Sequence, residues 1–171
     1  CTNCTTGKYN DQLGQAACTD CTTGKYNDQL GRTACTHCAR GKYNDEFGST
    51  ARDDCANCTQ GKYNGQLGST TERACANCAR GKYNDELGRP DACTDCVKGK
   101  YNDQLGRDAC TDCAKGKYND QLGRQDACTD CASGRYNDQL GQVVCTNCTK
   151  GKYNDELGQN ACKDCANGKY N

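Results

Sequence analysis

Apolar and polar positions follow one short pattern that recurs every 17 to 20 residues along this chain. Each complete repeat reads C-[TA]-x-C-x-x-G-[KR]-Y-N-D-[QE]-[LF]-G-x-x-x, and Gly65 is the single exception at the Asp position. The apolar positions are the two cysteines, the tyrosine and the leucine, and no repeat has a helical period long enough for a stable helix. The pattern predicts a short strand around Lys8-Tyr9-Asn10, with a bend at Gly7 before it. It also predicts one helical or 3₁₀ turn over residues 10–14, which an asparagine caps and a glycine ends.

The repeats are marked by ten Cys-x-x-Cys pairs, and this regular spacing is typical of a repeat array. Length varies only between the second glycine of a repeat and the next cysteine, as at residues 49–54 and 69–74, where we expect surface loops. The repeats begin at Cys1, Cys18, Cys35, Cys55, Cys75, Cys93, Cys110, Cys128, Cys145 and Cys162.

The predicted fold class is a small disulfide-rich tandem repeat, an extended rod or solenoid of about ten repeats of 17–20 residues. We expect it to be mostly irregular, with short strands and single helical turns. An isolated repeat has too few apolar side chains to offset the entropy of ordering it, so each Tyr and Leu should stack on the next repeat. We expect one continuous array over residues 1–171. Because the chain starts on a cysteine and stops inside a repeat, we interpret it as a window of a longer chain whose signal peptide lies outside this segment.

Composition favours disulfides over a conventional core, since 20 of the 171 residues are cysteine, Met and Trp are absent, and Phe occurs once. Lys plus Arg equal Asp plus Glu at 22 each, and the two signs are mixed along the chain. We expect Lys8 and Asp11, which recur in nearly every repeat, to pair along the rod and to add roughly 0 to 1 kcal/mol per exposed pair. This balance gives no electrostatic reason to expect nucleic acid or a membrane surface as partner. No apolar run approaches the roughly 20 residues of a membrane span.

The cysteines are expected to pair between consecutive Cys-x-x-Cys pairs. A bridge within one pair is of a tight, redox-active type that does not suit ten successive sites. The most local choice joins the second cysteine of one pair to the first of the next, although sequence alone leaves other connectivities open. It leaves Cys1 and Cys165 unpaired in this segment. The predicted bridges are Cys4–Cys18, Cys21–Cys35, Cys38–Cys55, Cys58–Cys75, Cys78–Cys93, Cys96–Cys110, Cys113–Cys128, Cys131–Cys145 and Cys148–Cys162.

One string resembles known extracellular modules. Cys4-Thr5-Thr6-Gly7-Lys8-Tyr9, a loop of some dozen residues and then Cys18-Thr19-Asp20-Cys21 resemble the first module of a tumour necrosis factor receptor cysteine-rich domain. The string is equally similar to the ephrin-receptor-like cysteine-rich repeat of long extracellular proteins. The resemblance implies a bridge from the cysteine before Gly-x-Tyr to the cysteine that ends the loop, and an extended rod architecture. This chain differs in having two cysteines in every repeat, no second module type and no proline after the Cys pair.

Zinc binding is the main alternative use of the cysteines, because Cys-x2-Cys-x13-Cys-x2-Cys spacing can supply four thiolates to one ion. The repeats run in one register without alternating sites and linkers, which favours disulfides. Asx residues recur inside the Cys pairs, as Asn3 and Asp20, and again after each tyrosine. Calcium can use such oxygens, yet Asx-turns and helix caps need the same residues without an ion. We expect no metal and no cofactor.

Catalysis is not expected, because His37 is the only histidine and it occurs in one repeat of ten. The carboxylates recur along the array and do not converge on a cleft. We therefore predict no catalytic residues.

Three N-x-Thr sequons are possible N-glycosylation sites, at Asn3, Asn57 and Asn147. Each has a cysteine at its middle position, and the alternative is that the repeat consensus creates them by chance.

These features predict a secreted, extracellular or cell-surface structural protein that forms the shaft of a filament, appendage or matrix fibre. The expected partners are copies of the chain itself, with possible glycans. A receptor-like ectodomain that binds a protein ligand is the first alternative, and an intracellular four-cysteine zinc protein is the second.

Overall fold

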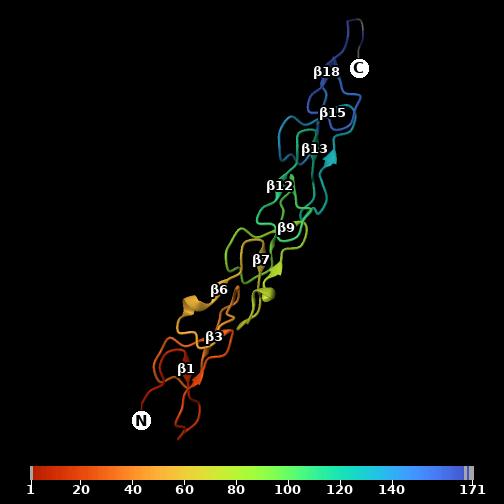
Figure 1. Ribbon diagram of the computed structural model, residues 1–171. Helices are drawn as coiled ribbons and strands as arrows, with labels where there is room; N and C mark the ends of the chain where they lie inside the picture. The colour runs from red at the N-terminus through yellow and green to blue at the C-terminus, as the bar shows by residue number, and fades with distance from the viewer. Residues whose placement is uncertain (1, 168, 170–171) are drawn as a thin grey trace. The chain divides into compact units, whose positions relative to one another are not determined.

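Small hairpins recur along the computed structural model, which describes residues 2–167 and 169. β1 (Lys8–Tyr9) pairs antiparallel with β2 (Thr19–Asp20), so the first strand belongs to one repeat and the second lies inside the next Cys pair. Nine such two-stranded hairpins occur among the described residues, joined by irregular backbone (Figure 1). The other strands are β3 (Lys25–Tyr26), β4 (Thr36–His37), β5 (Lys42–Tyr43), β6 (Ala56–Asn57), β7 (Lys62–Tyr63), β8 (Ala76–Asn77), β9 (Lys82–Tyr83), β10 (Thr94–Asp95), β11 (Lys100–Tyr101), β12 (Thr111–Asp112), β13 (Lys117–Tyr118), β14 (Thr129–Asp130), β15 (Arg135–Tyr136), β16 (Thr146–Asn147), β17 (Lys152–Tyr153) and β18 (Lys163–Asp164).

A tight turn precedes each hairpin because the first glycine of a repeat takes a left-handed backbone conformation. Gly7 has a φ of 78°, and the Lys8 amide donates to the Thr5 carbonyl at 3.2 Å. A four-residue turn with positive φ at its third position favours glycine there. The second glycine of the repeat, Gly14, also has a φ of 78°. The two bends predicted at the glycines are confirmed.

The helical turn predicted over residues 10–14 is wrong. These residues form a turn and bend, since the Asn10 side chain accepts from the Gln12 amide at 3.0 Å and no helical bond follows. Such an Asx-turn competes with a helical start. Among the described residues, 3₁₀ turns occur instead in the two longer loops, as η1 (Arg52–Asp54) and η2 (Glu72–Ala74).

Among the described residues, nine disulfides each join the cysteine before the turn that opens a hairpin to the cysteine directly before the second strand of the same hairpin. Their Cα atoms are 5.5 to 5.8 Å apart, within the range that a cystine spans. Among the described residues Cys165 is free, and Cys1 lies outside them. The local rule names the same pairs, which are Cys4–Cys18, Cys21–Cys35, Cys38–Cys55, Cys58–Cys75, Cys78–Cys93, Cys96–Cys110, Cys113–Cys128, Cys131–Cys145 and Cys148–Cys162.

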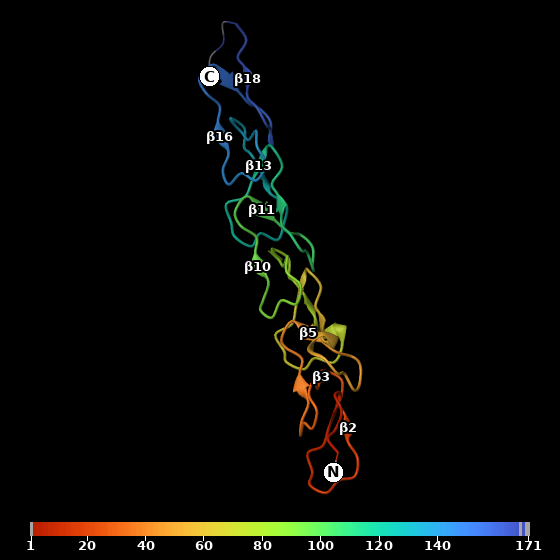
Figure 2. The ribbon, with the colours of Figure 1, turned by 90° about the vertical axis from the view of Figure 1, so that its left-hand side faces the viewer.

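Contacts divide the chain into two compact units. The first contains Cys1–Cys78 and Asn84–Cys93, and the second contains Ala79–Tyr83 and Thr94–Asn171. Within each unit every repeat bonds to the next in the same way. The prediction of a small disulfide-rich tandem repeat, mostly irregular with short strands, is confirmed, and the second view shows the same short arrows between irregular segments (Figure 2).

Cystine sulfur and asparagine, not leucine, fill the interior. The residues under 2% exposed are cysteines and four asparagines, Asn27, Asn44, Asn84 and Asn119. The leucine of the repeat is exposed, as Leu30 at 66% illustrates. The expected stacking of each leucine on the next repeat is therefore wrong, because its place in the Asp-Gln-Leu-Gly turn directs it to solvent. The tyrosines are mostly half-buried, as at Tyr9 and Tyr26.

Candidate functional site: the junction between repeats

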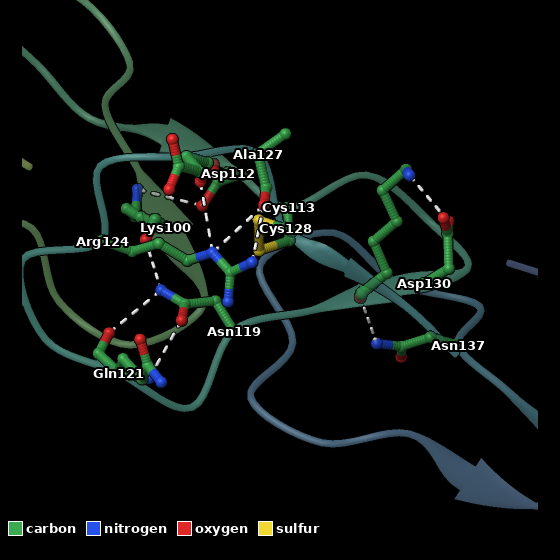
Figure 3. Close-up of a disulfide and its surroundings, with 12 residues drawn as sticks. Lys100, Asp112, Cys113, Asn119, Gln121, Arg124, Ala127, Cys128, Asp130 and Asn137 are labelled. Carbon is green, nitrogen blue, oxygen red and sulfur yellow. Dashed lines mark hydrogen bonds and ion pairs between the residues drawn. A yellow bond between two sulfur atoms is a disulfide. The ribbon is translucent and has the colours of Figure 1, made fainter. Parts of the chain in front are cut away.

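The asparagine after each tyrosine links two repeats. Asn119 is fully buried, and its Oδ1 accepts from the Gln121 amide at 2.9 Å. Its side-chain nitrogen donates to the Lys100 carbonyl of the preceding repeat at 2.7 Å and to the Gln121 carbonyl at 3.0 Å. Figure 3 shows this amide between the two carbonyls, beside the Cys113–Cys128 disulfide. Every polar atom of the side chain is thus bonded, which a buried amide requires.

This amide bridge recurs at equivalent positions in both compact units. In the first unit the Asn27 side chain donates to the Lys8 carbonyl at 2.6 Å. In the second unit the Asn137 side chain donates to the Lys117 carbonyl at 2.8 Å. The predicted Asx-turn is confirmed where Asn Oδ1 accepts from the amide two residues on, at Asn10, Asn27, Asn44, Asn64, Asn84, Asn102, Asn119 and Asn154. The link to the preceding repeat was not predicted, because an Asx-turn explains the same residue without burial.

Backbone bonds close the rest of each junction. The Gly116 amide donates to the Asn137 carbonyl at 2.8 Å, and the Cys131 amide donates to the Gly116 carbonyl at 2.8 Å. The Gly158 amide reaches back to the Cys131 carbonyl at 2.9 Å. These hydrogen bonds hold a glycine, an asparagine and a cystine of successive repeats against one another.

Both glycines are needed for this close approach. A Cβ on Gly116 would overlap the carbonyl oxygen of Gly158, two repeats further along the chain. A Cβ on Gly158 would lie 2.7 Å from Asp130 Oδ1 of the repeat before it. Both glycines also have positive φ, 78° and 70°. Glycine is therefore required here by packing as well as by backbone conformation.

Lysine and aspartate pair across the hairpins. We expected Lys8 and Asp11, which recur in nearly every repeat, to pair along the array. That pairing is wrong, because Lys8 Nζ lies 2.8 Å from Asp20, its cross-strand partner. The same pair recurs as Lys82–Asp95 at 2.6 Å. These ion pairs are exposed and contribute little free energy, roughly 0 to 1 kcal/mol each.

Lys152 should titrate above the ordinary range of a lysine. Its hydrogen bond and charge interaction with Asp164 raise the pKa of Lys152, and the Nζ–Oδ1 distance is 2.7 Å. The charged lysine is favoured in the folded chain, so this contribution is present below the ordinary pKa of 10.5 and is lost as pH rises through the higher folded value. An NMR titration of the lysine side chains should show the shift. Asp164→Asn should abolish it, and an unchanged Lys152 titration in that variant would contradict the assignment.

The Asx residues inside the Cys pairs do not converge. Asp112 and Asp130 lie in separate hairpins, on β12 and β14, and each faces a lysine. Within the part of the chain that the structure describes, no three His, Cys, Asp or Glu side chains lie close enough to hold a metal ion. Eighteen cysteines are bridged, so they are not the thiolates that a zinc site needs.

The remaining sequence candidates lie at the surface. His37 is exposed at the end of β4, opposite Lys25. The sequon residues Asn3, Asn57 and Asn147 are exposed too. The cysteine in the middle of each sequon is bridged.

Comparison with known proteins adds no relative. No protein-family model matches the chain, and no curated protein is significantly similar to it. Among the described residues, no helix is long and apolar enough to cross a membrane. The nine disulfides indicate an oxidising environment, and with the tandem repeats they indicate an extracellular protein of structural or ectodomain type.

Proposed function

We propose that this chain is a structural protein, not an enzyme, that forms the shaft of an extracellular filament, appendage or matrix fibre from stacked, disulfide-stapled repeats. One observation carries the proposal: the same bonds join successive repeats in both compact units. Gly7 N to Asn27 O in the first unit and Gly116 N to Asn137 O in the second are both 2.8 Å. A contact that is made identically at each step can be extended without limit by adding repeats.

The disulfides and the zero net charge also support a shaft. Each disulfide closes a loop of 14 to 17 residues, which is worth about 3 kcal/mol in a repeat too small to fold alone. The formal net charge is zero, so copies of the chain do not repel one another as a whole. The resemblance to tumour necrosis factor receptor and ephrin-receptor-like repeats belongs to this proposal, because both are extended extracellular modules.

The decisive experiment compares oxidised and reduced chains. Intact mass and crosslink mapping first establish that the nine bridges are present. We expect the oxidised chain to associate with rising concentration and to form filaments in negative-stain electron microscopy, and the reduced, alkylated chain to form none. An oxidised chain that stays a monodisperse monomer by light scattering at all concentrations would rule out the shaft as a self-assembling element.

A further inference from the structure

The second compact unit exposes one leucine per repeat at the same position of the Asp-x-Leu-Gly turn. Leu105, Leu122, Leu140 and Leu157, the knob leucines, are 64%, 67%, 62% and 67% exposed. A single exposed leucine is ordinary, but the same exposure at the same place in four successive repeats gives an apolar feature with the period of the fold.

Hollows recur in the same unit with the same period. The first hollow has a volume of about 460 Å³ and is lined by Tyr118, Asp120, Arg135, Val143 and Val144, among others. Val143 and Val144 are 39% and 60% exposed, so the floor of this hollow is partly apolar. Tyr118, Val143 and Val144 can contact a small apolar group in this hollow, and the charged side chains beside them can contact polar groups around it.

The second hollow lies one repeat further along the chain. It has a volume of about 270 Å³ and is lined by Tyr136, Asp138 and Lys152, among others. These residues occupy the repeat positions of Tyr118, Asp120 and Arg135 in the first hollow. At both junctions the hollow is therefore lined by the tyrosine and aspartate of one repeat and the base of the next. Asn160 and Ala161 line the second hollow at the positions of Val143 and Val144 in the first.

The charges around two of the knob leucines, Leu105 and Leu122, are complementary to those around the first hollow. Leu105 is flanked in its turn by the exposed Asp103 and Arg107, one acid and one base. The first hollow is lined by Asp120, Asp130 and Arg135. Asp130 is already paired with Lys117 at 2.6 Å, so one acid and one base, Asp120 and Arg135, remain at the hollow. When the turn that carries Leu105 lies on this hollow, Asp103 can face the base and Arg107 can face the acid. This orientation is favoured over one in which like charges face each other.

We propose that the knob leucines of one copy of this chain insert into the tyrosine-lined hollows of a second copy. A partner with any other spacing could engage one hollow, whereas a second copy presents knobs with the period of the hollows. A stable interface removes about 800 Å² from each partner, which one leucine cannot supply, so several knobs must engage together. The inference rests on the proposed function, because it names the surface through which the shaft associates laterally.

Photo-crosslinking tests the contact directly. A benzophenone amino acid at position 122 of the oxidised chain should crosslink to another copy, and peptide mapping should place the crosslink within residues 118–162, which contain the linings of both hollows. The same probe at the exposed Lys115, which does not line either hollow, should give far less intermolecular product. Crosslinks from position 122 to other parts of the partner would overturn the proposed contact.

A matched set of substitutions tests the energetics. Leu105, Leu122 and Leu140 changed together to serine should weaken association roughly tenfold or more, because three apolar side chains no longer leave water. Gln104, Gln121 and Gln139, each one residue earlier in the same turn, should tolerate serine with little change. Val143→Ser with Val144→Ser should weaken association from the hollow side. Intact mass should show nine disulfides in every variant.

The outcomes separate this inference from the proposed function. If the leucine variant assembles as well as the unsubstituted chain, the knob contact is wrong and the shaft proposal stands on another surface. If the unsubstituted oxidised chain shows neither association nor crosslinks at any concentration, both proposals fail.

Discussion

Replacing Gly116 with alanine will destabilise its junction by at least about 3 kcal/mol, whereas the same change at Gly134 will cost about 1–2 kcal/mol. The two glycines have the same φ of 78°. They also make matching bonds, since each amide donates to the asparagine carbonyl of the next repeat, at 2.8 and 2.7 Å. The strain of placing a Cβ on a left-handed backbone is therefore equal at both sites.

What differs is the space beside them. A Cβ on Gly116 would lie 2.5 Å from the Gly158 carbonyl carbon and would overlap its oxygen. A Cβ on Gly134 has no atom within 4 Å, because this 171-residue chain has no equivalent glycine two repeats beyond it. The backbone at Gly158 cannot rotate away as a side chain could, so the junction must open.

Hydrogen exchange provides the measurement for this pair. The Cys131 amide, bonded to the Gly116 carbonyl, should lose most of its protection in Gly116→Ala. The Cys148 amide, bonded to the Gly134 carbonyl, should lose much less in Gly134→Ala. Equal losses in the two variants would mean that backbone strain alone, and not contact between repeats, makes glycine necessary.

The repeat and its bridges could be predicted from the sequence because they depend on features that are local along the chain. Cysteine spacing makes a bridge between neighbouring pairs the most local choice, and Gly7 marks a bend whichever residues surround it. The helical turn at residues 10–14 was predicted wrongly because an asparagine cap and an Asx-turn have the same local sequence, and only the presence of later helical bonds distinguishes them.

The junction between repeats could not be predicted, because the repeat pattern does not say which side chains of one repeat contact which atoms of the next. Leucine is the most apolar residue of the repeat after cysteine, and hydrophobicity placed it inside, yet Leu30 is 66% exposed and Asn27 is 1% exposed. A buried asparagine is favourable here only because the Lys8 carbonyl of the preceding repeat accepts its amide hydrogen. Lys8 pairs with Asp20 and not with Asp11 for the same reason, because β1 pairs with a strand of the next repeat.

Asn119→Asp will destabilise the second compact unit by about 3 kcal/mol at neutral pH, although the two side chains have nearly the same shape. Nδ2 of Asn119 donates to the Lys100 and Gln121 carbonyls at 2.7 and 3.0 Å. A carboxylate oxygen in its place would face two acceptors without a proton, in a site that excludes water. Asn119 is 0% exposed, so the charge could not be hydrated without opening the junction.

Acid should restore much of the lost stability in this variant. Burial and the two carbonyls disfavour the charged form, so the pKa of the carboxyl introduced at position 119 should lie above its unfolded value of about 3.9. The stabilising neutral form, which can donate one hydrogen bond, is fully present below that unfolded pKa and is lost as pH rises toward the folded pKa. Urea unfolding followed by circular dichroism from pH 3 to 8 should therefore show the difference from the unsubstituted chain growing with pH.

Asn10→Asp supplies the matched control. Asn10 occupies the same repeat position and its Oδ1 accepts from the Gln12 amide at 3.0 Å, a bond that a carboxylate can also accept. Asn10 is half-buried, and among the described residues its side-chain nitrogen donates no hydrogen bond to a carbonyl of another repeat. The substitution should cost little at any pH. A pH-independent loss in Asn119→Asp, or an equal loss in both variants, would show that the amide bridge between repeats does not hold the junction closed.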